Sequence, residues 1–361
     1  MDPVEVELPT YRVIIARGAL AEIGRVAAAS ARAHRYAVIS DESVARLYAG
    51  RVRAALGEGR TRLYTIAPGE EQKTRATWGT LTDSMLAEGF GRDTAVIALG
   101  GGVVGDLAGF VAATFMRGVP YIQVPTTLLA MIDASIGGKT GVDTPAGKNL
   151  VGVFHQPAAV VADPDVLRTL PPEHLRAGLA EAIKHGVIAD ADYFDDVVNA
   201  APDIVSGNRS AAAALERVVV RSVSIKADVV KRDEREGGVR KTLNFGHTIG
   251  HAIELRSDYR MLHGEAVAVG MVLESRVAER LGIAEPGTSD RLRLGIERTG
   301  LPATRPANQT PDEILSATRG DKKARGGVVE YALPERIGAM AGGDRGWGTA
   351  VDDDVVLEVL Q

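Results

Sequence analysis

TAVIAL (Thr94–Leu99), GGGVVGD (Gly100–Asp106) and LAGFVAATFM (Leu107–Met116) follow one another without a break. The first stretch has the apolar pattern of a buried strand, and the last has the spacing of a helix. Glycines between a strand and a helix allow a tight turn in which backbone N–H groups can approach a pyrophosphate. We therefore predict a nucleotide-binding strand–turn–helix unit, although a glycine-rich packing turn would leave the same pattern.

This turn departs from the usual Rossmann fingerprint. It lies deep in the sequence, and no acidic residue follows about 20 positions later, where Tyr121–Val124 is apolar. Short apolar runs alternate with helical stretches throughout this half, which favours a mostly parallel, Rossmann-like sheet with helices on both faces. The predicted strands are Tyr11–Ala16, Tyr36–Ser40, Arg62–Ile66, Thr94–Leu99, Tyr121–Val124 and Ala159–Ala162, and the helical stretches include Ser43–Leu56 and Thr74–Glu88.

A turn-rich segment, Asp163–Pro172, separates this pattern from a different one. Beyond it, long helical patterns dominate and β-branched runs disappear until Val328–Leu333. We therefore predict an α/β domain over residues 1–170 and a mainly helical domain over residues 171–361. The predicted helices are Glu173–Ala189, Ser210–Arg235, Val239–Leu255 and Gly264–Leu281.

The composition excludes several classes of function. The 361 residues include no cysteine, so disulfides, thiol catalysis and cysteine-ligated metals are excluded. The net charge is −5 and the basic residues form no long run, which argues against nucleic-acid binding. Apolar runs are shorter than the ~20 residues of a membrane helix, and the acidic start MDPVEVELPT lacks the apolar core of a signal peptide. We expect a cytoplasmic protein without a membrane partner.

Three segments of the helical half carry possible metal ligands. Glu181 lies in GLAEAIKHG, His247 and His251 lie in LNFGHTIGHAIE, and His263 opens LHGEAVAVGM. One carboxylate and two imidazoles with an open fourth position form a recurrent catalytic zinc set. His247 and His251 are four residues apart on one predicted helix, so spacing alone pairs them as ligands.

The same helix face would also present Arg240 and Asn244. A stripe of Arg, Asn, His and His without Glu or Lys suits a cleft that binds an anion beside a metal, and the alternative is a surface helix with incidental histidines. Glu181 and Lys184 are three residues apart, so a surface ion pair is the alternative for that glutamate. Basic residues close to small or turn residues can mark a phosphate or carboxylate site, although each alone could be a solvated surface residue. They are Arg117, Lys139, Lys148, Lys226, Lys322 and Lys323.

Taken together, these segments resemble the 3-dehydroquinate synthase family over nearly the whole chain. The resemblance rests on long blocks in a fixed order: PGEEQKT, ALGGGVVGDLAGFVAATFMRGVPYIQVPTTLLAMIDASIGGKTGVD, GKNLVGVFHQP, LRAGLAEAIKHG, IKADVV, RKTLNFGHTIGHAIE, LHGEAVAVGM and DKKARGG. It implies an NAD-binding α/β domain, a helical metal- and substrate-binding domain with the active site between them, and a homodimer. Asp143 and His155 depart from the family, where many relatives carry Asn and Tyr.

The resemblance also implies a role for each matching residue. The metal ligands, for zinc or alternatively cobalt, fall on Glu181, His247 and His263, which replaces the His247–His251 pair. The NAD contacts fall on Asp41, Glu70, Lys73, Gly101, Gly102, Asp106, Thr126, Thr127 and Lys148. The substrate contacts fall on Arg117, Asp133, Lys139, Asn149, Lys184, Lys226, Arg240 and Asn244, with Lys322 or Lys323 at a phosphate. The catalytic residues are His251, Lys139, Glu236 and Arg240.

The implied reaction converts 3-deoxy-D-arabino-heptulosonate 7-phosphate to 3-dehydroquinate and phosphate in the shikimate pathway of aromatic amino acid biosynthesis. Sibling cyclases that act on sedoheptulose 7-phosphate or glucose 6-phosphate are alternatives, but their substrates lack the carboxylate that Arg240 and Asn244 would bind. An amino-dehydroquinate synthase differs by one nitrogen in its substrate. A metal-dependent polyol dehydrogenase would share the architecture, but GGKTGV and GKNLVG argue against it. A non-catalytic relative is disfavoured because every ligand is present.

Overall fold

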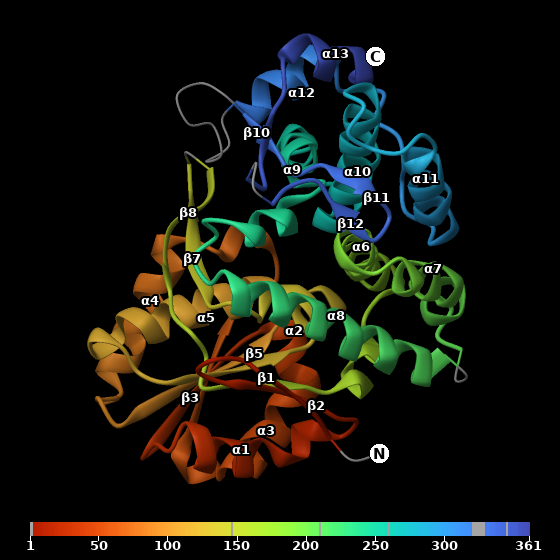
Figure 1. Cartoon of the computed structure of the whole chain (residues 1–361). Helices are drawn as coiled ribbons and strands as arrows, with labels where there is room; N and C mark the ends of the chain where they lie inside the picture. The colour runs from red at the N-terminus through yellow and green to blue at the C-terminus, as the bar shows by residue number, and fades with distance from the viewer. Residues whose placement is uncertain (1–2, 146, 209–210, 259, 320–328, 344–345) are drawn as a thin grey trace. The chain divides into compact units, whose positions relative to one another are not determined.

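The computed structural model describes residues 3–145, 147–208, 211–258, 260–319, 329–343 and 346–361. The chain forms two compact units, Met1–Leu170 and Pro171–Gln361, each coloured as a separate part of the spectrum in Figure 1. Among the described residues, no helix combines the length and apolar character needed to cross a membrane.

The first unit is built on a seven-stranded sheet with the order β1-β2-β9-β6-β5-β3-β4. Only β1 runs antiparallel to its neighbour, and the other pairs in this sheet are parallel. This confirms the α/β fold class and the predicted strands, and it adds an edge strand that the sequence did not indicate. The strands are β1 (Val4–Glu7), β2 (Arg12–Ile15), β3 (Arg35–Asp41), β4 (Thr61–Ile66), β5 (Thr94–Gly100), β6 (Tyr121–Pro125) and β9 (Ala159–Ala162).

Helices cover both faces of this sheet, as a parallel sheet requires. Every residue of β5 is buried. Figure 1 shows α4 (Arg75–Ala87) and α5 (Gly102–Thr114) on one side, and α1 (Ile23–Ser30) and α3 (Gly50–Leu56) on the other. The predicted stretch Ser43–Leu56 is helical throughout, with α2 (Glu42–Val44) and a π-helical segment, Ala45–Ala49, leading into α3.

The direction in which successive strands are added to the sheet reverses between β3 and β5. The chain passes from β3 outward to β4, then crosses back to β5 on the other side of β3. In open α/β sheets, ligands bind beyond the carboxyl ends of the strands at such a switch point. Here the two carboxyl ends are marked by Asp41 and Gly100, since Ser40 pairs with Leu99 in the register.

An antiparallel hairpin, β7 (Lys139–Thr144) and β8 (Gly147–Phe154), packs beside α5. A Cβ atom on Gly109 of α5 would lie 2.5 Å from Thr140 Cγ2, so glycine is needed for this approach. The sequence did not indicate this hairpin.

The second unit is mainly helical, as expected. One of its cores joins Ile249 and Ile253 to Val269, Leu273 and Val277. Its helices are α6 (Pro172–Ala189), α7 (Ala191–Val205), α8 (Ala212–Arg232), α9 (His247–Arg256), α10 (His263–Arg280), α11 (Thr288–Arg298), α12 (Pro311–Thr318) and α13 (Asp353–Leu360). Short strands, β10 (Glu330–Tyr331) with β13 (Thr349–Ala350) and β11 (Pro334–Arg336) with β12 (Ala339–Met340), complete it, and β10 lies within the described part of the predicted β-branched run.

The prediction of one helix over Val239–Leu255 is wrong. Val239–Asn244 is a 3₁₀ helix, Phe245 is not helical (φ −55°, ψ +130°), and α9 begins only at His247. Gly246 breaks the helix because its φ is +76°, and a Cβ atom there would lie 2.3 Å from Met271 Cγ. The histidines therefore do not continue a single helical stripe that begins at Arg240.

Candidate active site

Glu181, His247 and His263 converge in the second unit. The Glu181 Oε1 atom lies 3.5 Å from Nε2 of His247 and 3.5 Å from Nε2 of His263. Glu181 comes from the middle of α6, whereas the two histidines are the first residues of α9 and α10. The structure therefore brings together the three residues that the family resemblance implies.

Close helix packing makes this convergence possible. A Cβ atom on Gly264 would lie 2.0 Å from the carbonyl oxygen of Ala177, so the backbones of α10 and α6 touch at this point. Gly264 follows His263 directly, and Ala177 is one helical turn before Glu181. The contact thus places the start of α10 against the turn of α6 that precedes the carboxylate.

The second nitrogen of each histidine is already bonded. His247 Nδ1 lies 3.0 Å from the Phe245 carbonyl oxygen, and His263 Nδ1 lies 3.3 Å from Glu254 Oε2. Histidines that bind metals usually donate their other ring N–H to a carbonyl or carboxylate in this way. The arrangement leaves Nε2 of both rings directed toward Glu181.

Charge and burial shift the pKa values of His247 and His263 in opposite directions. Burial, with the positive charge of Lys184, lowers the pKa of His247 well below its usual value, so this imidazole is neutral. Burial also lowers the pKa of His263, but hydrogen bonds with Glu181 and Glu254 outweigh it and raise that pKa to about 10. A proton must therefore leave His263 before its Nε2 can bind a metal ion.

The surface alternatives for this region are wrong. Glu181 and Lys184 do form an ion pair, but both side chains are only 1% exposed. A buried charge pair of this kind is costly to desolvate and is weak evidence for a purely stabilising role. His247 is also buried, so α9 is not a surface helix with incidental histidines.

His251 lies beside the three converging residues. Its ring centroid is 5.1 Å from that of His247 and 5.6 Å from that of His263, and a nitrogen from each of the three rings lies within 4.8 Å of the others. Because Glu181 can supply the third ligand, His251 can serve as a nearby proton donor or acceptor instead.

The segment before α9 holds the predicted anion-binding residues. Arg240 is 1% exposed, and its guanidinium donates to the Glu234 carbonyl oxygen. Asn244 Nδ2 donates to Glu236 Oε1, and Glu236 has a left-handed backbone with φ +63°. Lys226 on α8 is buried, whereas Lys322 and Lys323 lie outside the described residues.

The glycine turn of the first unit forms an open helix N-terminus. Gly101 is the N-cap of α5 and offers no side-chain cap to the first N–H groups of the helix. A Cβ atom on Gly101 would lie 3.1 Å from Thr127 Cγ2, so this glycine also keeps the turn close to the segment after β6. Asp41 stands at the end of the neighbouring strand β3, where its Oδ1 accepts hydrogen bonds from Ser43 and Val44. The missing acidic residue of the fingerprint thus has a counterpart on a strand that precedes the turn.

Lys73 is the centre of a charged network near this turn. It is 4% exposed, and its Nζ lies 3.0 Å from Glu70, 3.4 Å from Asp106 and 3.7 Å from Asp143. Lys148 lies 3.4 Å from Glu70 in the same network. Four of the predicted NAD contacts therefore meet here, joined by Asp143, whose only signal in the sequence was its departure from the family.

Asp106→Asn should stabilise the protein at neutral pH. Burial raises the Asp106 pKa to about 6, although Lys73 opposes this shift. A raised pKa in the folded state favours folding at low pH, and that contribution is lost as the pH rises from about 4 to about 6. We expect the asparagine variant to gain unfolding free energy at pH 7.5, offset in part by the lost Asp106–Lys73 ion pair, and to gain much less at pH 4.5, in urea titrations.

The exposed Asp93 supplies the control for this experiment. Asp93→Asn should change stability little at either pH. Equal gains at both pH values for Asp106→Asn, or a loss at pH 7.5, would contradict the burial argument.

The remaining predicted substrate residues of this unit lie on separate elements. Lys139 begins β7, Asn149 lies on β8 with φ +54°, and Asp133 lies on the π-helical segment Ala130–Ala134. Arg117 is exposed just before the amino end of β6, whereas Thr126 and Thr127 follow its carboxyl end. The structure does not bring Arg117 to the glycine turn, since a five-residue strand separates them.

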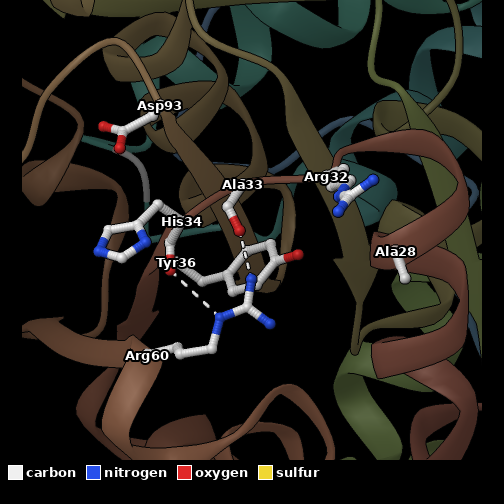
Figure 2. A pocket seen from close by; sticks show the side chains of 7 residues that line it. All are labelled: Ala28, Arg32, Ala33, His34, Tyr36, Arg60 and Asp93. Carbon is white, nitrogen blue, oxygen red and sulfur yellow. Dashed lines mark hydrogen bonds between the residues drawn. The ribbon is translucent and has the colours of Figure 1, made fainter.

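A cavity of about 630 Å³ lies at the opposite edge of the sheet (Figure 2). Tyr36 lies near the start of β3, and His34, Arg60 and Asp93 directly precede β3, β4 and β5, so the cavity faces the amino ends of these parallel strands. The Arg60 guanidinium donates to the carbonyl oxygens of Ala33 and His34 and lies 5.3 Å from the centre of the Tyr36 ring. This cavity is therefore distinct from the edge that carries the glycine turn.

Comparison with known proteins identifies the family. Residues 63–177 match the family model described as 3-dehydroquinate synthase N-terminal, and residues 178–324 match the one described as 3-dehydroquinate synthase C-terminal. The chain belongs to the 3-dehydroquinate synthase family. A 3-dehydroquinate synthase from Symbiobacterium thermophilum is 47% identical over 338 residues, covering 91% of this chain and 92% of the relative.

Solved structures of related cyclases share the family's fold. A 2-deoxy-scyllo-inosose synthase complexed with carbaglucose-6-phosphate, NAD⁺ and Co²⁺ has a TM-score of 0.87 at 28% identity, covering 99% of both chains. A 2-epi-5-epi-valiolone synthase from Streptomyces hygroscopicus with NAD⁺ and Zn²⁺ bound has a TM-score of 0.85 at 31% identity, covering 98% of this chain and 97% of that one.

Proposed function

We propose that this chain is a 3-dehydroquinate synthase, a carbon–oxygen lyase of the shikimate pathway. It converts 3-deoxy-D-arabino-heptulosonate 7-phosphate to 3-dehydroquinate and phosphate, with NAD and a divalent metal, zinc or cobalt, as cofactors. The observation that carries the proposal is the convergence of Glu181, His247 and His263 in a chain of this family.

The donor set fits a divalent metal. One carboxylate and two imidazole nitrogens, from three helices, match the catalytic zinc pattern with a fourth position open to substrate. Both histidines have their Nδ1 atoms engaged, by Phe245 and by Glu254, which supports binding through Nε2. These contacts support Glu181, His247 and His263 as the ligands.

The first unit fits a dinucleotide. The uncapped start of α5 at Gly101 and Gly102 offers N–H groups to a pyrophosphate. Asp41 at the end of β3 and the Lys73 network flank the same edge of the sheet. We assign the NAD contacts to the set implied by the sequence: Asp41, Glu70, Lys73, Gly101, Gly102, Asp106, Thr126, Thr127 and Lys148.

When bound, NAD would supply reversible hydride transfer, and a divalent metal held by Glu181, His247 and His263 would supply Lewis-acid polarisation of substrate hydroxyl groups. The protein residues supply binding and orientation. His251, next to the ligands, is placed to move a proton, and the buried Arg240 is fixed by the Glu234 carbonyl so that it can hold a carboxylate. Glu236 accepts a hydrogen bond from Asn244, and this contact fixes the carboxylate that the proposal assigns to proton transfer.

A basic set binds the anionic ends of the sugar phosphate in this proposal. The lysine, arginine and asparagine side chains of this set carry a positive charge or an amide donor, which suits phosphate and carboxylate oxygens. Asp133 would instead accept from a substrate hydroxyl. The residues implied by the resemblance are Asp133, Lys139, Asn149, Lys184, Lys226, Arg240, Asn244 and Lys322 or Lys323, together with Arg117, which this chain carries at the amino end of β6, away from the glycine turn.

Phosphate release tests the proposal. The protein with catalytic NAD should release phosphate from 3-deoxy-D-arabino-heptulosonate 7-phosphate without accumulation of NADH, and a chelator should stop the reaction. Turnover of glucose 6-phosphate or sedoheptulose 7-phosphate instead would indicate a sibling cyclase. Preference for the amino analogue of the substrate would indicate an amino-dehydroquinate synthase, and NADH accumulation with glycerol would indicate a polyol dehydrogenase.

A homodimer is part of the proposal. Leu150, Val151, Val153 and Phe154 of β8 are each 37–46% exposed, an unusual run of apolar side chains on one strand. Within the described residues, β8 pairs only with β7, so its other edge could face a second copy. Light scattering after size exclusion would measure the mass, and a monomer at micromolar concentration would contradict this part.

The cytoplasmic location is likewise a prediction, testable by cell fractionation.

A further inference from the structure

Glu274 places a buried carboxylate at the start of α9. It lies on α10 and is 0% exposed. Its Oε2 accepts from the Gly246 N–H at 2.6 Å, and its Oε1 accepts from the Ile249 N–H at 3.0 Å. Both N–H groups belong to the unpaired first turn of α9, which begins with His247.

Helix α9 has no capping side chain of its own. Gly246 occupies the N-cap position, and no side chain can be added there because a Cβ atom would meet Met271 Cγ at 2.3 Å and the Val267 carbonyl at 2.9 Å. In a capping box, two side chains serve the N-cap and N3 N–H groups. Here one carboxylate from the neighbouring helix serves both.

A second carboxylate links the same helices at their other end. Gly246 lies against Gly270, and Gly250 lies against Val267, so α9 and α10 run antiparallel in close contact. Glu254 of α9 lies 3.3 Å from Nδ1 of His263, the first residue of α10. Each helix thus supplies a carboxylate that holds the ligand-bearing start of the other.

We propose that Glu274 is a positioning residue, which sets the place of His247 relative to His263. The inference rests on the proposed function, because it assumes that these histidines bind the metal. His247 is the first residue of α9, so a shift of this end moves its Nε2 relative to Glu181. Loss of a group that orients a metal ligand without binding the metal itself commonly weakens metal affinity by about 10- to 100-fold.

Glu279 provides a matched control on the same helix. Its Oε1 accepts from the Ser289 N–H at 2.9 Å and its Oε2 from the Ser289 hydroxyl at 2.7 Å, at the start of α11. It is thus a carboxylate that caps a helix but holds no candidate metal ligand. Glu274→Gln and Glu279→Gln each replace an oxygen acceptor by an amide group, so both should lower the melting temperature.

The test measures Co²⁺ affinity and the visible absorption of the cobalt protein. Glu274→Gln should raise the Kd for Co²⁺ by at least about tenfold and alter the absorption bands, whereas Glu279→Gln should change neither. If Glu274→Gln does not fold, Glu274→Asp, which keeps the charge but is shorter by one methylene, should show the same direction of change. Unchanged affinity and spectrum in a folded variant would make Glu274 a structural cap only. Failure of the unmodified protein to bind either Co²⁺ or Zn²⁺ would instead overturn the proposed function.

Discussion

His263→Ala is expected to remove bound metal and reduce activity by at least about 1,000-fold. The substitution leaves Glu181 and His247 as the remaining ligands of the proposed set. A catalytic metal stabilises charge in the transition state by several kcal/mol, and about 4 kcal/mol corresponds to this loss of rate. Metal content per chain and phosphate release from the heptulosonate phosphate measure the two effects.

His174→Ala is the control for this variant. His174 is an exposed residue near the start of α6, the helix that carries Glu181. Its removal should leave both metal content and rate unchanged. Stoichiometric metal in His263→Ala would show that the ligand assignment is wrong, and lost activity with retained metal would move His263 to another role.

The sheet could be predicted because its strands carry strong local signals. β5 is a continuous apolar run closed by glycines, and such a run has few alternatives to a buried parallel strand. The β7–β8 hairpin could not be predicted, because glycine and polar residues interrupt the apolar pattern of both strands. It packs against α5 through a close approach to Gly109. Contacts between distant segments leave little trace in local periodicity.

The proposed metal site shows the same limit of local sequence signals. Four-residue spacing pairs His247 with His251, and the spacing of Glu181 and Lys184 also allows a surface ion pair. The structure brings Glu181 and His263 close to His247 through helix crossings, at Gly264 with Ala177 and at Gly250 with Val267, and it keeps His251 beside them. The family resemblance favours Glu181 as a ligand over the surface ion pair, whereas nothing in the sequence indicates Glu254 or Glu274 as supports, because their partners lie on other helices.

Gly264→Ala should destabilise the protein by at least about 2 kcal/mol and weaken metal binding. Alanine normally favours a helix over glycine by about 1 kcal/mol, but a Cβ atom here would lie 2.0 Å from the Ala177 carbonyl oxygen. Both sides of this contact are backbone, so α10 and α6 must separate, and overpacking of this kind typically costs about 1–3 kcal/mol or more. Urea unfolding and cobalt titration measure the two effects.

Gly79 in α4 is the matched control, since nothing lies within 4 Å of a Cβ atom built there. Gly79→Ala should therefore stabilise the protein by about 0.5–1 kcal/mol and leave metal affinity unchanged. The two variants make the same chemical change in a helix and differ only in what the methyl group meets. If Gly264→Ala stabilised the protein, the helices would not touch at this point. The Gly264–Ala177 contact would then not be what brings Glu181 and His263 together.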